Sequence, residues 1–66
     1  MKLVEVLSKQ QDPWYGVNVT AIYQEEDSKQ YWKISYNDMV PFDSQWARKV
    51  KVYRLTKTVD EWVEYF

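Results

Sequence analysis

Residues 17–36 have the sequence VNVTAIYQEEDSKQYWKISY, and this stretch decides the fold. Apolar and polar side chains alternate along 17–24 and again along 30–36, as they do in strands with one buried face. The segment 25–29 between them is short, polar and acidic, which predicts an antiparallel hairpin with a solvated tip. The alternation puts on one face Val17, Val19, Ala21, Tyr23, Trp32, Ile34 and Tyr36.

On the N-terminal side of this hairpin, residues 2–8 predict another strand because they are rich in branched side chains. Residues 10–16 predict the turn that joins the two strands. Asp12 suits the first position of a type I turn, Pro13 presets the backbone angle of the second, and Gly16 closes the segment.

On the C-terminal side, residues 37–47 are expected to form a loop, since Pro41 is incompatible with a central strand. Residues 49–55 alternate and predict a fourth strand. A helix that begins at Asp43 is the alternative for this segment. The β-branched side chain of Val50 favours the strand.

Residues 58–66 predict a C-terminal helix. Thr58 is placed as an N-cap, and Glu61 three residues later completes a capping box. Nine residues do not form a stable helix alone in water, so this helix is expected to pack on the sheet. Its apolar stripe has helical spacing and consists of Val59, Trp62, Val63 and Phe66.

The expected fold class is therefore α+β: a four-stranded antiparallel sheet with one C-terminal helix packed on it. The sheet is either open or curled toward a small SH3-like or OB-like barrel. Residues 1–66 form a single domain, because a chain of this length has room for only one core.

The composition argues against an enzyme. The chain has no cysteine and no histidine, which removes disulfides, the usual zinc ligands and the most common general base. Its single glycine removes a glycine-rich phosphate loop. We therefore expect no cofactor, no metal site and no catalytic residues. The lack of cysteine, of a signal peptide and of a long apolar segment predicts a cytoplasmic protein without a membrane anchor.

The aromatic content predicts recognition. Four tryptophans, six tyrosines and two phenylalanines in 66 residues exceed what a minimal core needs. Tryptophan and tyrosine are enriched among interface hot spots. The leading hypothesis is a small protein-binding module of the inhibitor or adaptor type, which docks on a larger host protein and has the size of proteins encoded by phages or plasmids. The candidate contact residues lie in expected turns and loops: Trp14, Tyr15, Met39, Phe42 and Trp46.

The alternative hypothesis is a single-stranded nucleic-acid binder. Residues 1–47 carry a net charge of −3 and residues 48–66 a net charge of +2, so the basic side chains gather near the end of the chain. If Val50 and Val52 point into the core, tyrosines and lysines of two strands share the outward face and form a stacking platform. The candidate residues are Tyr31, Lys33, Lys49, Lys51, Tyr53 and Arg54.

A small core gives marginal stability, and this leaves the oligomeric state open. The protein is expected to be a monomer or a homodimer that buries its spare rings against a second copy.

Overall fold

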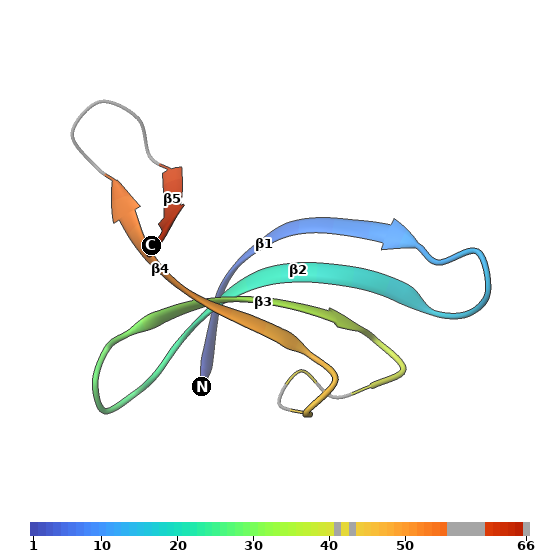
Figure 1. Ribbon diagram of the computed structural model, residues 1–66, viewed down its shortest axis with the longest axis horizontal. Coiled ribbons are helices and arrows are strands. Elements are labelled where there is room, and N and C mark those ends of the chain that lie inside the picture. The colour runs from blue at the N-terminus through green and yellow to red at the C-terminus, as the bar shows by residue number, and fades with distance from the viewer. Residues whose placement is uncertain (41, 43, 56–60, 66) are drawn as a thin grey trace.

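A computed structural model describes residues 1–40, 42, 44–55 and 61–65 of the chain. They form one five-stranded antiparallel sheet that curls into half a barrel, in which each strand pairs with the next along the sequence (Figure 1). None of the described residues is helical. The strands are β1 (Lys2–Gln11), β2 (Val17–Gln24), β3 (Tyr31–Asn37), β4 (Arg48–Leu55) and β5 (Glu61–Glu64).

The hairpin predicted from residues 17–36 is confirmed as β2 and β3. Its register places Val19 opposite Tyr36, and Ala21 opposite Ile34. The tip is closed by backbone hydrogen bonds, with the amide of Glu25 donating to the carbonyl of Gln30 at 2.9 Å. The predicted alternation therefore sets which residues share a face.

The larger buried cluster lies on the face of β2 and β3 that carries Val19, Ala21, Tyr23 and Ile34, here called the loop face. Phe42 and Ala47 of the β3–β4 loop pack against this cluster. The ring of Phe42 stacks on that of Tyr23 at a centroid distance of 4.4 Å. The hydroxyl groups of Tyr23 and Tyr36 are hydrogen-bonded at 3.0 Å. Burial is the main cause that raises the pKa of Tyr23 to about 12, and this hydrogen bond is the second.

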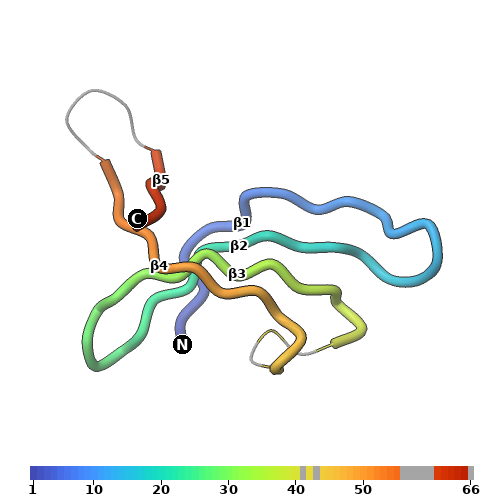
Figure 2. Tube along the Cα trace, in the orientation of Figure 1, coloured from blue at the N-terminus to red at the C-terminus, as the bar shows by residue number. Residues whose placement is uncertain are grey.

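The opposite face, here called the inner face, carries Thr20, Ile22, Lys33, Ser35, Val50 and Val52. Ile22 and Val52 are 0% and 1% exposed. The curl of the sheet covers these two side chains, because it brings the outer strands β1 and β4 toward each other over the inner face. The carboxylate of Glu5 on β1 lies 3.9 Å from the guanidinium of Arg54 on β4. The trace of the chain follows β4 from the β3–β4 loop to its pairing with β5 (Figure 2).

The edge strand β1 is longer than predicted and pairs only with β2. None of its ten residues is buried. Two irregularities in its register, between Leu3 and Glu5 and between Val6 and Ser8, leave Val4 and Leu7 without a partner across the ladder. Such bulges twist an edge and interrupt the regular spacing that another strand would need for pairing.

The predicted C-terminal helix is wrong. Residues 61–64 form β5, which pairs antiparallel with β4 and places Trp62 opposite Arg54. The second edge of β4 offers a backbone ladder, whereas an isolated nine-residue helix has only its own few hydrogen bonds. Thr58, Val59 and Phe66, which were part of the predicted helix, lie outside the described residues.

The fold class of four strands and one helix is consequently also wrong, since the described chain is all-β with five strands. The alternative helix over the fourth strand is contradicted as well, because residues 48–55 are β4. Asp43, where that helix would begin, and Pro41 lie outside the described residues.

Candidate protein-binding surface

Four large apolar side chains are strongly exposed in the two turns that connect β1 to β2 and β3 to β4. Trp14 is 86% exposed and Trp46 78% exposed. Tyr15 and Met39 are 65% and 67% exposed. We call these four residues the loop-end surface.

The turn that carries Trp14 and Tyr15 is organised by Asp12. One carboxylate oxygen of Asp12 accepts hydrogen bonds from the backbone amides of Trp14 at 2.8 Å and Tyr15 at 3.4 Å. The other oxygen accepts from the side-chain amide of Asn18 at 3.0 Å. These bonds lower the pKa of the Asp12 carboxyl, with the Trp14 amide as the largest cause. The aspartate thus fixes the backbone from which both rings project.

Asn37 joins this turn to the β3–β4 loop. Its side-chain nitrogen donates to the carbonyl of Tyr15 at 3.2 Å and to the side-chain oxygen of Asn18 at 3.0 Å. Its side-chain oxygen accepts from the amide of Met39 at 2.9 Å. One side chain therefore links the backbone positions of Tyr15 and Met39.

Asp38 makes a second connection between the two turns. Its carboxylate accepts from the amide of Val17 at 2.8 Å, and its own amide donates to the carbonyl of Val17 at 2.9 Å. The two turns consequently form one hydrogen-bonded unit.

Gly16 is required where the two turns meet. Its φ is +71°, which favours glycine. A Cβ atom at this position would lie 2.5 Å from Asn37 Oδ1, 2.6 Å from Asp38 Oδ1 and 2.8 Å from Met39 Cγ. Both the backbone conformation and the close approach therefore select glycine.

Trp46 lies beside the same unit. Its backbone amide donates to the hydroxyl of Ser44 at 3.2 Å. Its side chain borders a shallow groove with a volume of 330 Å³, which also includes Asn37. The other residues of this groove are Asn18, Val19, Thr20, Ser35 and Tyr36.

A second, more apolar groove runs from this end along the exposed edge strand. Leu3 and Val6 of β1 form one wall and are 51% and 44% exposed. Asp38 lies at its border, so the groove reaches the hydrogen-bonded unit that joins the two turns. The remaining residues around it are Lys9, Val17, Val19 and Tyr36.

Of the five residues predicted to contact a protein, the structure brings four together at this end of the sheet. Phe42 is the exception, because it packs on the core against Tyr23 and Tyr36. Its position in the loop did not distinguish it from Met39 or Trp46, and only the tertiary contacts separate them.

The residues predicted to form a nucleic-acid platform are divided between the two faces. Tyr31 lies opposite Val52, and Lys33 opposite Val50, so these residues share the inner face with the two valines. Lys49 and Lys51 lie opposite Ile34 and Trp32 on the loop face. The predicted single platform depended on the opposite orientation of β4. A shift of one residue in the register moves every side chain of a strand to the other face.

On both faces most of these candidates contact other side chains. On the inner face, the ring centroids of Trp62 and Tyr31 are 4.8 Å apart. The guanidinium carbon of Arg54 lies 5.2 Å from the centroid of the Trp62 ring. On the loop face, Lys51 Nζ lies 5.7 Å from the centroid of the Trp32 ring. The ring centroids of Tyr53 and Tyr65 are 5.3 Å apart. The rings of this surface therefore contact neighbouring side chains across the strands.

Sequence analysis did not single out the polar residues that hold the loop-end surface together. Asp12 was placed only as a turn-forming residue, Asn18 lay in a predicted strand, and Asn37 and Asp38 were only the start of the expected 37–47 loop. The available signal was the clustering of Asp12, Asn18, Asn37 and Asp38 next to both expected turns, since such side chains commonly bond to backbone groups.

Within the described part of the chain, no three acidic side chains are placed to hold a metal ion. Nor do these residues include a helix with the length and apolar character needed to cross a membrane. No protein-family model, no curated protein and no solved structure matches this chain.

Proposed function

We propose that this protein is a small protein-binding module that docks its loop-end surface on a larger protein. One observation carries the proposal: four exposed apolar side chains project from two turns that a single hydrogen-bonded unit around Asn37 holds together. Tryptophan and tyrosine give large contact areas, and they frequently dominate binding energy at interfaces.

The rigidity of the two turns supports this function. Binding costs free energy for each group that must be ordered, so a backbone fixed in advance increases affinity. The groove beside Leu3 and Val6 extends the apolar contact area beyond the four residues. An exposed apolar surface of this kind, bordered by polar side chains, is typical of interaction sites.

We further propose that the domain acts by occupancy, as an inhibitor or adaptor in the cytoplasm, and not by catalysis. The absence of histidine and cysteine from the sequence supports this. Binding of single-stranded nucleic acid is less well supported, because the two β4 lysines and the Tyr31–Lys33 pair lie on opposite faces. The bulges of β1 also argue against a homodimer formed by continuous pairing of two edge strands.

The test is quantitative binding with matched surface variants. The partner is first captured from host cells, identified, purified and titrated against the wild-type domain by calorimetry. Trp14→Ala and Trp46→Ala are each expected to weaken binding by at least about tenfold, as hot-spot truncations do. Circular dichroism should show an unchanged fold, since both side chains are almost fully exposed.

Tyr65→Ala is the control, because Tyr65 is a 53% exposed ring that follows β5 and is outside the loop-end surface. It should leave the affinity within about twofold of wild type, as most peripheral residues do. The opposite pattern, in which Tyr65→Ala abolishes binding and the two tryptophan variants retain it, would place the interface elsewhere and refute the proposal.

A further inference from the structure

A small polar pocket on the inner face has a composition suited to an anion. Lys33, Ser35, Arg48, Val50 and Glu64 surround it, and its volume is 130 Å³. Three strands, β3, β4 and β5, contribute these residues. We propose that this pocket binds a single oxyanion, a carboxylate or a phosphate, between Arg48 and Lys33.

The charges in the pocket do not balance. Lys33 Nζ lies 2.5 Å from Glu64 Oε1, and this ion pair is partly exposed. The hydrogen bond from Lys33 is the main cause that lowers the pKa of Glu64, and the positive charge of Arg48 contributes to the same shift. Two cations therefore share one carboxylate. The surplus of one positive charge gives an incoming anion a partner.

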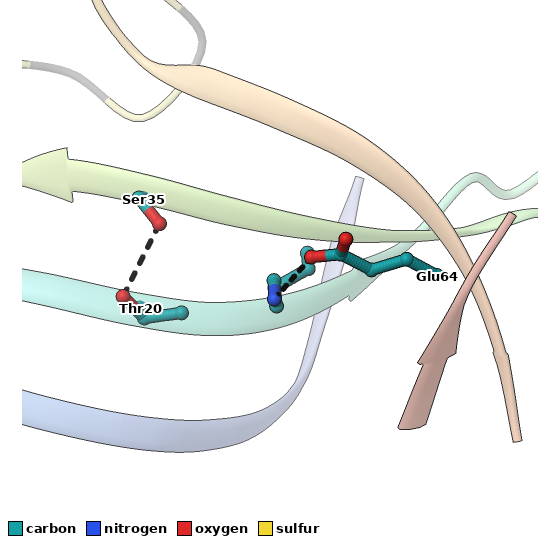
Figure 3. A network of polar contacts seen from close by, with 4 residues as sticks. Thr20, Ser35 and Glu64 are labelled. Atoms are coloured by element: carbon teal, nitrogen blue, oxygen red, sulfur yellow. Dashed lines mark hydrogen bonds and ion pairs between the residues drawn. The ribbon is translucent and has the colours of Figure 1, made fainter. Parts of the chain in front are cut away.

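Ser35 places a hydroxyl group at the same site, and this hydroxyl can donate to an anion when Thr20 donates to Ser35. It lies directly opposite Arg48 on one side and opposite Thr20 on the other, so the three side chains form a row across β2, β3 and β4. The hydroxyl oxygens of Thr20 and Ser35 are 3.2 Å apart (Figure 3). Such a pair uses one of its two hydroxyl hydrogens internally, and the other can be donated to a third acceptor.

The size and shape of the site select a small ligand. A volume of 130 Å³ accommodates one carboxylate or phosphate group but not a nucleotide. The planar guanidinium of Arg48 suits two parallel hydrogen bonds to such a group. Val50 is the one apolar residue of a lining that is otherwise polar or charged.

The pocket adjoins the loop-end surface, because Ser35 also borders the groove beside Trp46. An acidic side chain of a protein seated on Trp46 would therefore reach the pocket, and so would free phosphate. The inference does not depend on the proposed function, since anion binding is measured on the isolated domain and docking is measured with the tryptophan variants.

The experiment is an NMR titration of the isotope-labelled domain with inorganic phosphate and, separately, with acetate. Ionic strength is held constant with chloride, so that general screening does not change during the titration. We expect saturable shifts at the Ser35 and Arg48 amides with a dissociation constant in the millimolar range. Saturation with acetate identifies carboxylates as ligands, and saturation with phosphate alone restricts the site to phosphoryl groups.

Three variants test the assignment. Arg48→Gln should weaken binding at least tenfold. Lys49→Gln makes the same change of charge at the next residue on the opposite face, and should change affinity less than twofold. Glu64→Gln should tighten binding severalfold, because it removes the carboxylate that competes for Lys33. Equal losses in Arg48→Gln and Lys49→Gln, or no saturable shift with either anion, would overturn the proposal.

Discussion

The aromatic side chains of the sheet and those of the loop-end surface have opposite surroundings. Trp32 on β3 is half-buried, and its indole nitrogen donates to Glu25 Oε1 at 2.6 Å. Trp14 is 86% exposed, and the polar contacts around it involve its backbone. In the sheet, cross-strand neighbours cover the ring. In the turn, Asp12 and Asn37 bond to the backbone and leave the rings exposed. The same residue type therefore supports the fold in one region and is free for recognition in the other.

The largest expected effect is a difference in the free energy of unfolding between the alanine variants of Trp32 and Trp14. Trp32→Ala should lower the free energy of unfolding by about 3 kcal/mol, because it removes a ring packed against the core together with its hydrogen bond to Glu25. Trp14→Ala should change it by less than about 0.5 kcal/mol, as exposed substitutions usually do. Urea unfolding followed by circular dichroism measures both. Equal losses in the two variants would contradict the distinction between these regions.

An intermediate effect is expected from the two residues with positive φ within the described part of the chain, Gly16 beside the loop-end surface and Lys29 at the tip of the sheet hairpin. Gly16→Ala should destabilise the protein by about 2 kcal/mol, because a methyl group adds left-handed strain and overlaps with Asn37 and Asp38. Lys29, at the tip of the β2–β3 hairpin, has a φ of 62°. Lys29→Gly should relieve its strain and stabilise the protein by up to about 1 kcal/mol.

Thermal unfolding of both variants measures the expected loss of stability in Gly16→Ala and the expected gain in Lys29→Gly. If Gly16→Ala is as stable as the wild type, the two turns do not form the close contact that orients the loop-end surface.

The smallest expected effect is a loss of stability in acid. The pKa of Asp12 is lowered by its bonds to the turn, and that of Glu25 by hydrogen bonds from Ser28 and then Trp32. The unfolded-state pKa is 3.8 for Asp12 and 4.5 for Glu25, and the folded-state pKa of each is lower. Each carboxylate therefore contributes its full stability above its unfolded pKa, and this contribution is lost as the pH falls through the folded pKa.

Asp12→Asn and Glu25→Gln should each reduce the slope of stability against pH below about pH 5. Denaturant unfolding at a series of pH values provides the measurement. Since both carboxylates are at the surface, the changes should be small. A slope unaffected by either substitution would show that these two carboxylates do not anchor the backbone of Trp14 or the ring of Trp32.

The part of the candidate surface that could be predicted is the position of its rings in turns. Trp14, Tyr15, Met39 and Trp46 were predicted because residues in loops are less often needed for the core. Phe42 has the same kind of position in the sequence, yet it stacks on Tyr23. Which of these residues returns to the core depends on the path of the whole β3–β4 loop, and no local pattern encodes that path.

The sequence by itself determined the β2–β3 hairpin and the faces of its two strands, because a side-chain period of two and a short polar connection are local properties. It also excluded disulfides and the usual zinc ligands by composition. The tertiary structure alone decided the register of β4, the pairing of residues 61–64 as a strand and the union of two distant turns around Asn37. These features depend on which strand edges and backbone groups meet in space, and the favourable free energy of such contacts arises only when the chain has folded.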